Sequence, residues 1–277
     1  MPGWLQDLTD LVLPTECAGC GRSRTVLCPE CRAALTGAAP SRVRPVPEPP
    51  GLPVVHAAAP YADEVRATLL AHKERGALAL ARPLGAALAR AVRAGCGRRD
   101  APVLLVPVPS ARRAVRARGH DPVRRIALAA AGELRRSGRR ARVAGVLRQR
   151  RAVADQSGLN SRQRQGNLAG ALEVMAGGAR LLAGGHLVLV DDLLTTGASL
   201  TEAARAVREA PAEEIGRRIV YERATREGRE ERIGGSQEER RNATYEGAGM
   251  ADTNGAGRLI RAAVIAAPPD SFEIIRY

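Results

Sequence analysis

The chain has 277 residues, which is enough for one or two domains with a sizeable hydrophobic core. Its formal net charge of +14 favours phosphate-bearing partners, and its aromatic content of only 2% argues against a stacking platform for single-stranded nucleic acid. No apolar run reaches about 18 residues, so we expect no membrane span. The first residues include Asp7 and Asp10 and lack the basic region of a secretory signal, so we expect a cytoplasmic, reducing location.

Four of the five cysteines form two CxxC pairs, Cys17 with Cys20 and Cys28 with Cys31. Two such pairs a few residues apart are typical of a structural Zn²⁺ site with four thiolate ligands. Because four thiolates leave no open coordination position, the metal would be structural rather than catalytic. Disulfides or reduced thiols are the alternative, and disulfides are disfavoured in a reducing compartment. Cys96 lies apart, in a predicted loop, and is interpreted as an incidental thiol.

The elements that follow alternate between strands and helices. Residues 1–36 form a predicted zinc module with a helix at Pro29–Leu35, and residues 37–53, rich in Pro and Gly, form a predicted linker. The predicted strands are Val54–Tyr61, Val103–Pro109, Arg142–Leu147, Leu187–Val190 and Leu259–Ala267. The predicted helices are Ala62–Gly76 with Asp63 as its cap, Pro83–Ala94, Asp121–Arg136 and Ala198–Val207, while residues 112–119 and 148–168 are predicted as loops. This rhythm predicts an α/β domain.

The positive charge is unevenly distributed along the chain. Residues 101–167 contain sixteen arginines and three acids, which is nearly the whole surplus. Lys73 is the only lysine and alanine is abundant, a bias that a GC-rich genome explains, although it does not explain the clustering. The stretch is therefore either a face for nucleic acid or a solvated surface, and the sequence leaves both interpretations open.

His186–Leu200 is the stretch most indicative of function. Its apolar run shows no polar alternation, which predicts a parallel strand buried on both faces. Asp191 and Asp192 stand at the carboxyl end of that strand, where open α/β sheets bind ligands. The next helix offers its N-terminus to a phosphate, and carboxylates accept hydrogen bonds from vicinal hydroxyls. The pattern predicts a sugar-phosphate site; the alternative is a buried strand followed by an ordinary turn, with the acids solvated.

This stretch resembles the phosphoribosyl-pyrophosphate (PRPP) motif of type I phosphoribosyltransferases. The resemblance implies that Asp191 and Asp192 hold the ribose 2′- and 3′-hydroxyls. It also implies a loop that wraps the 5′-phosphate, formed by Thr195, Thr196, Gly197, Ala198 and Ser199.

Further segments resemble the ComF family, which is linked to bacterial competence and joins an N-terminal zinc knuckle to a type I phosphoribosyltransferase-like domain. The segments that carry the resemblance are His72–Gly76, Val106–Pro109, Arg116–Gly119 and the spaced residues Gln156, Leu159, Arg164 and Asn167. His72 and His120 depart from the family pattern, because each stands where the family has phenylalanine. A second departure is the polar segment at residues 211–258, predicted to be disordered or a solvated helix, and either a genuine insertion or a defect of the gene model.

The resemblance implies an α/β fold class, with a type I phosphoribosyltransferase-like parallel sheet flanked by helices over residues 54–277, preceded by a small zinc-ribbon module. It implies a protein that binds PRPP with Mg²⁺ and supports DNA uptake with single-stranded DNA or a helicase partner. Candidate contacts for pyrophosphate or DNA are Lys73, Arg112, Arg116 and Arg118, and candidates for a hood over the site are Gln156, Arg164 and Asn167. The alternatives are a metabolic phosphoribosyltransferase acting on a nucleobase or amine, and a non-catalytic nucleic-acid-binding module. The sequence identifies no catalytic residue, acceptor or oligomeric state.

Overall fold

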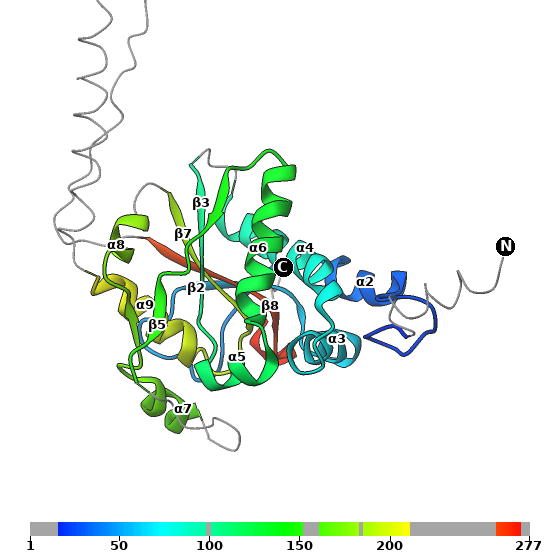
Figure 1. The fold of residues 1–277 in the computed structure, drawn as a ribbon, viewed down its shortest axis with the longest axis horizontal. Helices are drawn as coiled ribbons and strands as arrows, with labels where there is room; N and C mark the ends of the chain where they lie inside the picture. The colour runs from blue at the N-terminus through cyan, green and yellow to red at the C-terminus, as the bar shows by residue number, and fades with distance from the viewer. Residues whose placement is uncertain (1–15, 98–100, 152–160, 183–184, 211–258, 273–277) are drawn as a thin grey trace, which may run out of the picture.

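The structure is a computed structural model that describes residues 16–97, 101–151, 161–182, 185–210 and 259–272 (Figure 1). Its strands are β1 (Ser41–Val43), β2 (Val54–Pro60), β3 (Val103–Pro107), β4 (Ala141–Val143), β5 (Leu147–Gln149), β6 (Leu172–Val174), β7 (His186–Leu193) and β8 (Ile260–Ala267). Its helices are α2 (Pro29–Thr36), α3 (Asp63–Glu74), α4 (Ala81–Cys96), α5 (Arg112–Arg118), α6 (Pro122–Arg136), α7 (Ser161–Leu168), α8 (Gly178–Leu181) and α9 (Ala198–Arg208), with short 3₁₀ turns η1 (Leu78–Leu80) and η2 (Pro269–Ser271).

The main sheet has the strand order β1-β2-β8-β7-β3-β4 among the described residues. Strands β2, β8, β7, β3 and β4 run parallel to one another. Strand β1 pairs antiparallel with β2 at one edge of the sheet. A separate antiparallel ribbon is formed by β5 and β6. The predicted fold class is therefore confirmed as a mixed α/β protein with a mostly parallel sheet flanked by helices. Since β7 lies inside this sheet, its apolar run Leu187–Val190 is buried on both faces, as the absence of alternation predicted.

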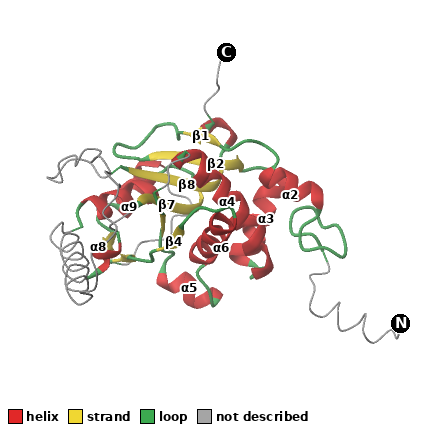
Figure 2. Cartoon of the chain, turned by 90° about the horizontal axis from the view of Figure 1, so that it is seen from above, coloured by secondary structure: helices red, strands yellow, loops and turns green. Residues whose placement is uncertain are grey.

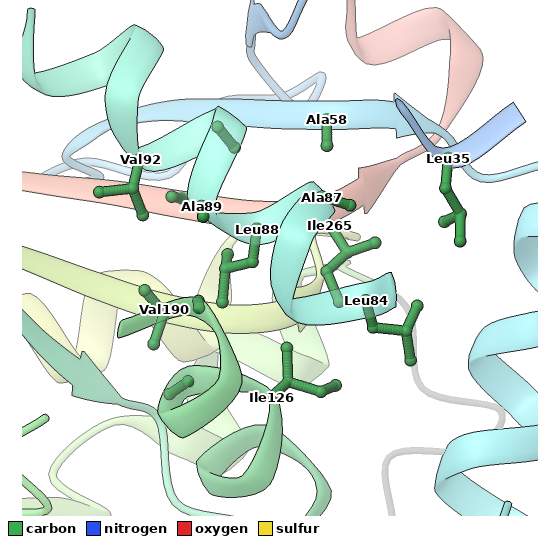
Figure 3. Packing of buried hydrophobic residues seen from close by; sticks show 14 of the residues in the cluster. Leu35, Ala58, Leu84, Ala87, Leu88, Ala89, Val92, Ile126, Val190 and Ile265 are labelled. Atoms are coloured by element: carbon green, nitrogen blue, oxygen red, sulfur yellow. The ribbon is translucent and has the colours of Figure 1, made fainter. Parts of the chain in front are cut away.

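Helices cover both faces of the sheet (Figure 2). On one face, α4 and α6 place Leu88 and Ile126 in a common cluster with Val190 of β7 and Ile265 of β8 (Figure 3). Gly85 permits the close approach of these two helices, because a Cβ atom there would lie 2.5 Å from the Ala129 Cβ. On the other face, α9 packs its apolar side onto β7 and β8. The carboxyl end of β7 is thus held rigidly between two helical layers.

Three local predictions were wrong. Residues 112–118 form helix α5 rather than a loop, because arginine and alanine are good helix formers and only Gly119, at φ +72°, ends the run. Asp63 does not cap α3; Ala62 is the capping residue and makes no side-chain hydrogen bond. Cys96 is the buried last residue of α4 and does not lie in a loop.

Two segments contain more regular structure than the sequence predicted. The predicted linker contains β1, which pairs Ser41 with Ala57 and Val43 with Val55. The single strand predicted at Arg142–Leu147 is divided between β4 and β5, and α7 lies in the predicted loop at 148–168. Gln156, Leu159 and the segment 211–258 lie outside the described residues. The division into residues 1–36, 37–53 and 54–277 stays a prediction.

Within the described part of the chain, no helix combines the length and the apolar character that a membrane crossing requires.

Candidate functional site

Asp191 and Asp192 lie within the last residues of β7, at the carboxyl edge of the parallel strands. Asp191 is paired with Val264 of β8, and its Oδ1 accepts a hydrogen bond from the Asp192 N–H at 2.8 Å. The strand thus continues through both acids to Leu193, which extends the strand predicted as Leu187–Val190. Asp192 is buried and Asp191 half-buried. The backbone of a central strand therefore fixes both carboxylates at the place where such sheets bind ligands.

Lys73, in the last turn of α3, donates from its Nζ to Asp192 Oδ2 at 2.8 Å. Burial disfavours the charged ammonium, but the Asp192 carboxylate more than compensates and raises the pKa of Lys73. Lys73 therefore stays a cation throughout the physiological pH range. The structure places this residue, which the sequence predicted as a phosphate contact, directly at the acid pair.

The charge of Lys73 acts on both acids. Burial, together with the neighbouring Asp192, raises the pKa of Asp191 well above its ordinary value, and Lys73 opposes this shift. A neutral donor that approaches the pair, such as a sugar hydroxyl, finds carboxylate oxygens able to accept its hydrogen bonds. The electrostatics therefore favour a polyhydroxylated or cationic ligand at this position.

The loop between β7 and α9 is short and anchored at both ends. The Leu194 N–H donates to the Ala266 carbonyl at 2.9 Å, and Gly197, at φ +77°, is the N-terminal cap of α9. The Ala198 N–H donates to Thr196 Oγ1 at 3.5 Å. Thr195 is exposed, and Ser199 is partly accessible in the first turn of α9. The loop thus presents hydroxyls and a helix N-terminus beside the acid pair, which is the arrangement that suits a phosphate.

Gly197→Ala is expected to lower stability by about 1–2 kcal/mol, since a left-handed conformation is costly for any residue with a Cβ. It should also displace the loop, because the added Cβ would lie 3.1 Å from Leu52 Cδ1 and 3.2 Å from Pro49 Cγ. Gly138→Ala is the matched control: its φ is +81°, but no atom lies within 4 Å of the added Cβ. Thermal unfolding should show destabilisation of both variants, larger in Gly197→Ala because of this crowding, and ligand titration should show weaker phosphate binding in Gly197→Ala alone. Equal binding by the two variants would contradict the assignment of the loop.

The remaining basic candidates lie on α5, which follows the carboxyl end of β3. Arg118 makes a two-pronged ion pair with Glu74, through Nε at 3.0 Å and Nη2 at 2.8 Å. Arg112 and Arg116 are exposed on the same helix. Arg118 is therefore committed to positioning α5 against α3, whereas Arg112 and Arg116 are accessible to a ligand.

The predicted hood residues Arg164 and Asn167 lie on α7, which packs against α9. Leu168 joins Ala171 and Ala198 in a small buried cluster, so α7 contacts the first residue of the helix that follows the phosphate loop. The structure therefore places α7 beside the start of α9, and the role of a hood stays a prediction.

Glu202 is a buried residue that the sequence analysis did not single out. Its carboxylate accepts from the Leu172 N–H at 2.9 Å and from Arg205 Nε at 2.7 Å, and Arg205 Nη2 donates to the Leu172 carbonyl at 2.8 Å. Although burial opposes ionisation, Arg205 and the Leu172 N–H lower the pKa of Glu202. Glu202 and Arg205, which both bind the backbone of Leu172, therefore join the β5–β6 ribbon to α9. An acid and an arginine three residues apart in a predicted helix were the sequence signal of this pair.

The four N-terminal cysteines lie together. The Sγ atoms of Cys17, Cys20, Cys28 and Cys31 are all within 4.8 Å of one another, and three of the residues are buried. None of the four forms a disulfide. Within the second CxxC pair the Cys31 N–H donates to Cys28 Sγ at 3.5 Å, and the Cys28 N–H donates to Cys17 Sγ at 3.3 Å, which joins the two pairs. The cluster could hold a zinc ion as predicted, and four sulfur donors fit a closed, structural site.

Burial and hydrogen bonding shift the pKa values of two of these thiols in opposite directions. Burial, followed by hydrogen bonding to the other cysteines, raises the pKa of Cys31 well above that of a free thiol. The pKa of Cys17 is lowered to about 6, because hydrogen bonds from backbone N–H groups, that of Cys28 foremost, outweigh burial. Metal binding requires all four thiols to ionise, so an ion would have to displace the proton of Cys31.

An acid pair and a helix N-terminus at the carboxyl end of a parallel strand of an α/β fold are an arrangement that suits a nucleotide or sugar-phosphate ligand. Residues 140–238 match the family model described as a phosphoribosyl transferase domain. The matched range contains β7, Asp191, Asp192 and α9, and it excludes Lys73 and the cysteine cluster. No curated protein and no solved structure matches the chain.

Proposed function

We propose that this protein binds PRPP at the carboxyl end of β7. Asp191 and Asp192 accept hydrogen bonds from the ribose 2′- and 3′-hydroxyls, and Thr195–Ser199 surround the 5′-phosphate. The observation that carries the proposal is the junction of an acid pair, a short loop and a helix N-terminus inside the matched phosphoribosyl transferase domain. Carboxylates suit the hydroxyls and N–H groups suit the phosphate, so each half of the site fits one half of the ligand.

PRPP enters, in this proposal, as its Mg²⁺ complex. The acid pair and the pyrophosphate are both negative, so their approach requires cations. Lys73 supplies one beside Asp192, and the exposed Arg112 and Arg116 stand on the helix that follows the neighbouring strand. Mg²⁺ on the pyrophosphate supplies the rest, and the contribution of the protein is then positioning and electrostatics.

We further propose a ComF-type protein that supports DNA uptake from the cytoplasmic side, with zinc in the four-cysteine cluster. The combination of that cluster with the sugar-phosphate site supports this role. A single-stranded DNA or helicase partner is supported by the arginines exposed on α5 and α6, such as Arg113, Arg124 and Arg125. A metabolic phosphoribosyltransferase for a nucleobase or amine is the second candidate, which the domain match itself supports.

The direct test is a calorimetric titration of the zinc-loaded protein with Mg²⁺–PRPP at moderate salt. We expect saturable binding at one site, and much weaker binding of ribose 5-phosphate and of Mg²⁺–pyrophosphate, because each carries only half of the recognised groups. Absence of PRPP binding in folded, zinc-loaded protein would reject the proposal. Pyrophosphate release that depends on an added base or amine would favour the metabolic transferase.

A further inference from the structure

The last turn of α3 reaches three different neighbours through three consecutive side chains. Lys73 contacts Asp192, and Glu74 receives the two-pronged ion pair of Arg118. His72 is 1% exposed and makes a tilted ring contact with His120, with ring centroids 5.8 Å apart and planes inclined by 59°. Figure 1 shows α3 and α5 at the same end of the molecule, below α6. The position of Lys73 therefore depends on contacts made by its two neighbours in sequence.

The hydrogen bonds of the two rings favour one tautomer of each neutral ring. His72 Nδ1 lies 3.3 Å from the Ala77 carbonyl, and His120 Nδ1 lies 3.1 Å from the Arg118 carbonyl. A carbonyl can only accept, so each Nδ1 carries the proton and each Nε2 of a neutral ring is a bare acceptor. Both Nε2 atoms are buried and have no hydrogen-bond partner among the described residues. A proton added to His120 Nε2 would thus create a buried N–H without an acceptor among the described residues, and one added to His72 would face the Pro122 carbonyl, whose contact does not offset the burial of the ring.

The two rings contact each other, so they form one buried feature of the fold. A pair of phenylalanines could fill the same space, but it could not titrate.

The charges around the pair favour its neutral form. The groups that act on His72 from other elements are His120 and, from α6, Arg125. On its own helix Lys73 and Glu74 follow, and both are already paired. Around His120 stand Arg118, paired with Glu74, and Asp121, which caps α6 by accepting from the Arg124 N–H at 3.1 Å.

Two further elements that pack against α3, η1 and α2, supply no counter-ion to either histidine. η1 has no charged residue, and α2 carries only Glu30, which is paired with Arg22, and Arg32. Neither ring therefore has an uncommitted carboxylate facing it among these groups.

We propose that His72 and His120 are positioning residues that hold Lys73 at Asp192 while both rings are neutral and release the last turn of α3 when one ring is protonated. This inference rests on the proposed function, because the consequence for the ligand is weaker PRPP binding in acid. Lys73 would no longer offset the charge of the acid pair as the pyrophosphate approaches. The pair would thereby make the site sensitive to pH on the acid side of the ordinary histidine range.

The direction of the pH effect follows from the pKa of His72 in the folded state. Burial first, and then the proximity of His120 and Arg125, lower the pKa of His72 below its ordinary value. The unfolded chain therefore binds the proton more readily, so this contribution to stability is present above the unfolded pKa of about 6.5 and is lost as the pH falls through the lower folded value.

The test compares PRPP affinity at about pH 7.5 and pH 5.5, on either side of the histidine range. Wild-type protein should lose roughly tenfold more affinity than the double variant His72→Phe with His120→Phe, a difference of about 1.4 kcal/mol in binding free energy. Titration of the PRPP phosphates affects both proteins equally and cancels. His186→Phe, at the opposite end of β7, is the control and should behave as wild type. Equal pH dependence in wild type and double variant would overturn the inference.

A second readout does not require PRPP. Hydrogen exchange of the amides at residues 72–77, corrected for the intrinsic effect of pH, should show lost protection in acid for wild type but not for the double variant. Identical protection would overturn the inference even if PRPP binds, and a protein that binds no PRPP but shows the difference would reject only the proposed function. If the double variant does not fold, His120→Phe alone is measured, since it removes the ring that is less deeply buried.

Discussion

Replacement of Asp191 and Asp192 together by asparagine is expected to lower the affinity for Mg²⁺–PRPP by about 100-fold or more. Hydrogen bonds to charged groups contribute roughly 1.5–3 kcal/mol each, and about 1.4 kcal/mol corresponds to tenfold in affinity. The fold should persist, because asparagine has the shape of aspartate and the double substitution removes the repulsion between two adjacent carboxylates. Lys73, whose side chain is 35% exposed, can turn to solvent when it loses its partner.

The measurement is calorimetric titration, with circular dichroism and zinc content as checks on the fold. The matched control is Asp63→Asn with Glu133→Gln, which changes the net charge equally at the start of α3 and on α6. Its affinity should stay within about twofold of wild type, since distant surface charges are screened at moderate salt. Unchanged affinity in the Asp191 and Asp192 double variant would reject the site assignment.

The single substitutions separate two roles within the pair. Asp192→Asn removes both a ligand contact and the ion-pair partner of Lys73, whereas Asp191→Asn leaves that ion pair in place. If Lys73 matters for the pyrophosphate, Asp192→Asn should be the more damaging of the two.

The strand, the acid pair and the helix of the candidate site could be predicted from sequence because each rests on local chemistry. An apolar run without alternation, two acids and a glycine before a helix occupy fifteen consecutive residues, His186–Leu200. The cysteine cluster was predictable for the same reason, since the spacing of the two pairs encodes the two turns that bring the sulfur atoms together.

The partners of these residues could not be predicted, because they come from distant parts of the chain. Lys73 and Asp192 are 119 positions apart, and nothing local to either indicates the other. The sequence likewise offers sixteen arginines between residues 101 and 167 without indicating that Arg118 would be bound by Glu74. The contact between His72 and His120 depends on how α3 and the start of α6 meet, which is decided by tertiary packing.

Strand β1 is regular structure that the local sequence did not indicate. Its sequence is short and flanked by Pro and Gly, so local propensity predicted a linker. Pairing with β2 imposed the strand, because the edge of the parallel sheet offers unpaired backbone groups that even three residues can satisfy. Local propensity is weak evidence where a sheet edge is available.

Cys28→Ser is expected to abolish zinc binding and to destabilise the protein by several kcal/mol. The apparent binding free energy of structural zinc is on the order of 10 kcal/mol, and a site with three thiolates loses much of it. Serine is itself a favourable N-cap, so the substitution removes the sulfur ligand while it preserves the cap that Cys28 provides to α2. The loss of stability would therefore report the metal and not the helix.

The effect should extend beyond the cysteines, because Leu27, Cys31 and Leu35 belong to the same buried cluster as Leu84 and Leu88 of α4. Elemental analysis should give one zinc per wild-type chain and almost none in Cys28→Ser, with a clearly lower thermal midpoint. Cys96→Ser is the control, because it also alters a buried cysteine but one outside the four-cysteine cluster. Its zinc content should be unchanged and its loss of stability smaller. Retention of zinc by Cys28→Ser, or an equal loss by both variants, would contradict a four-cysteine metal site.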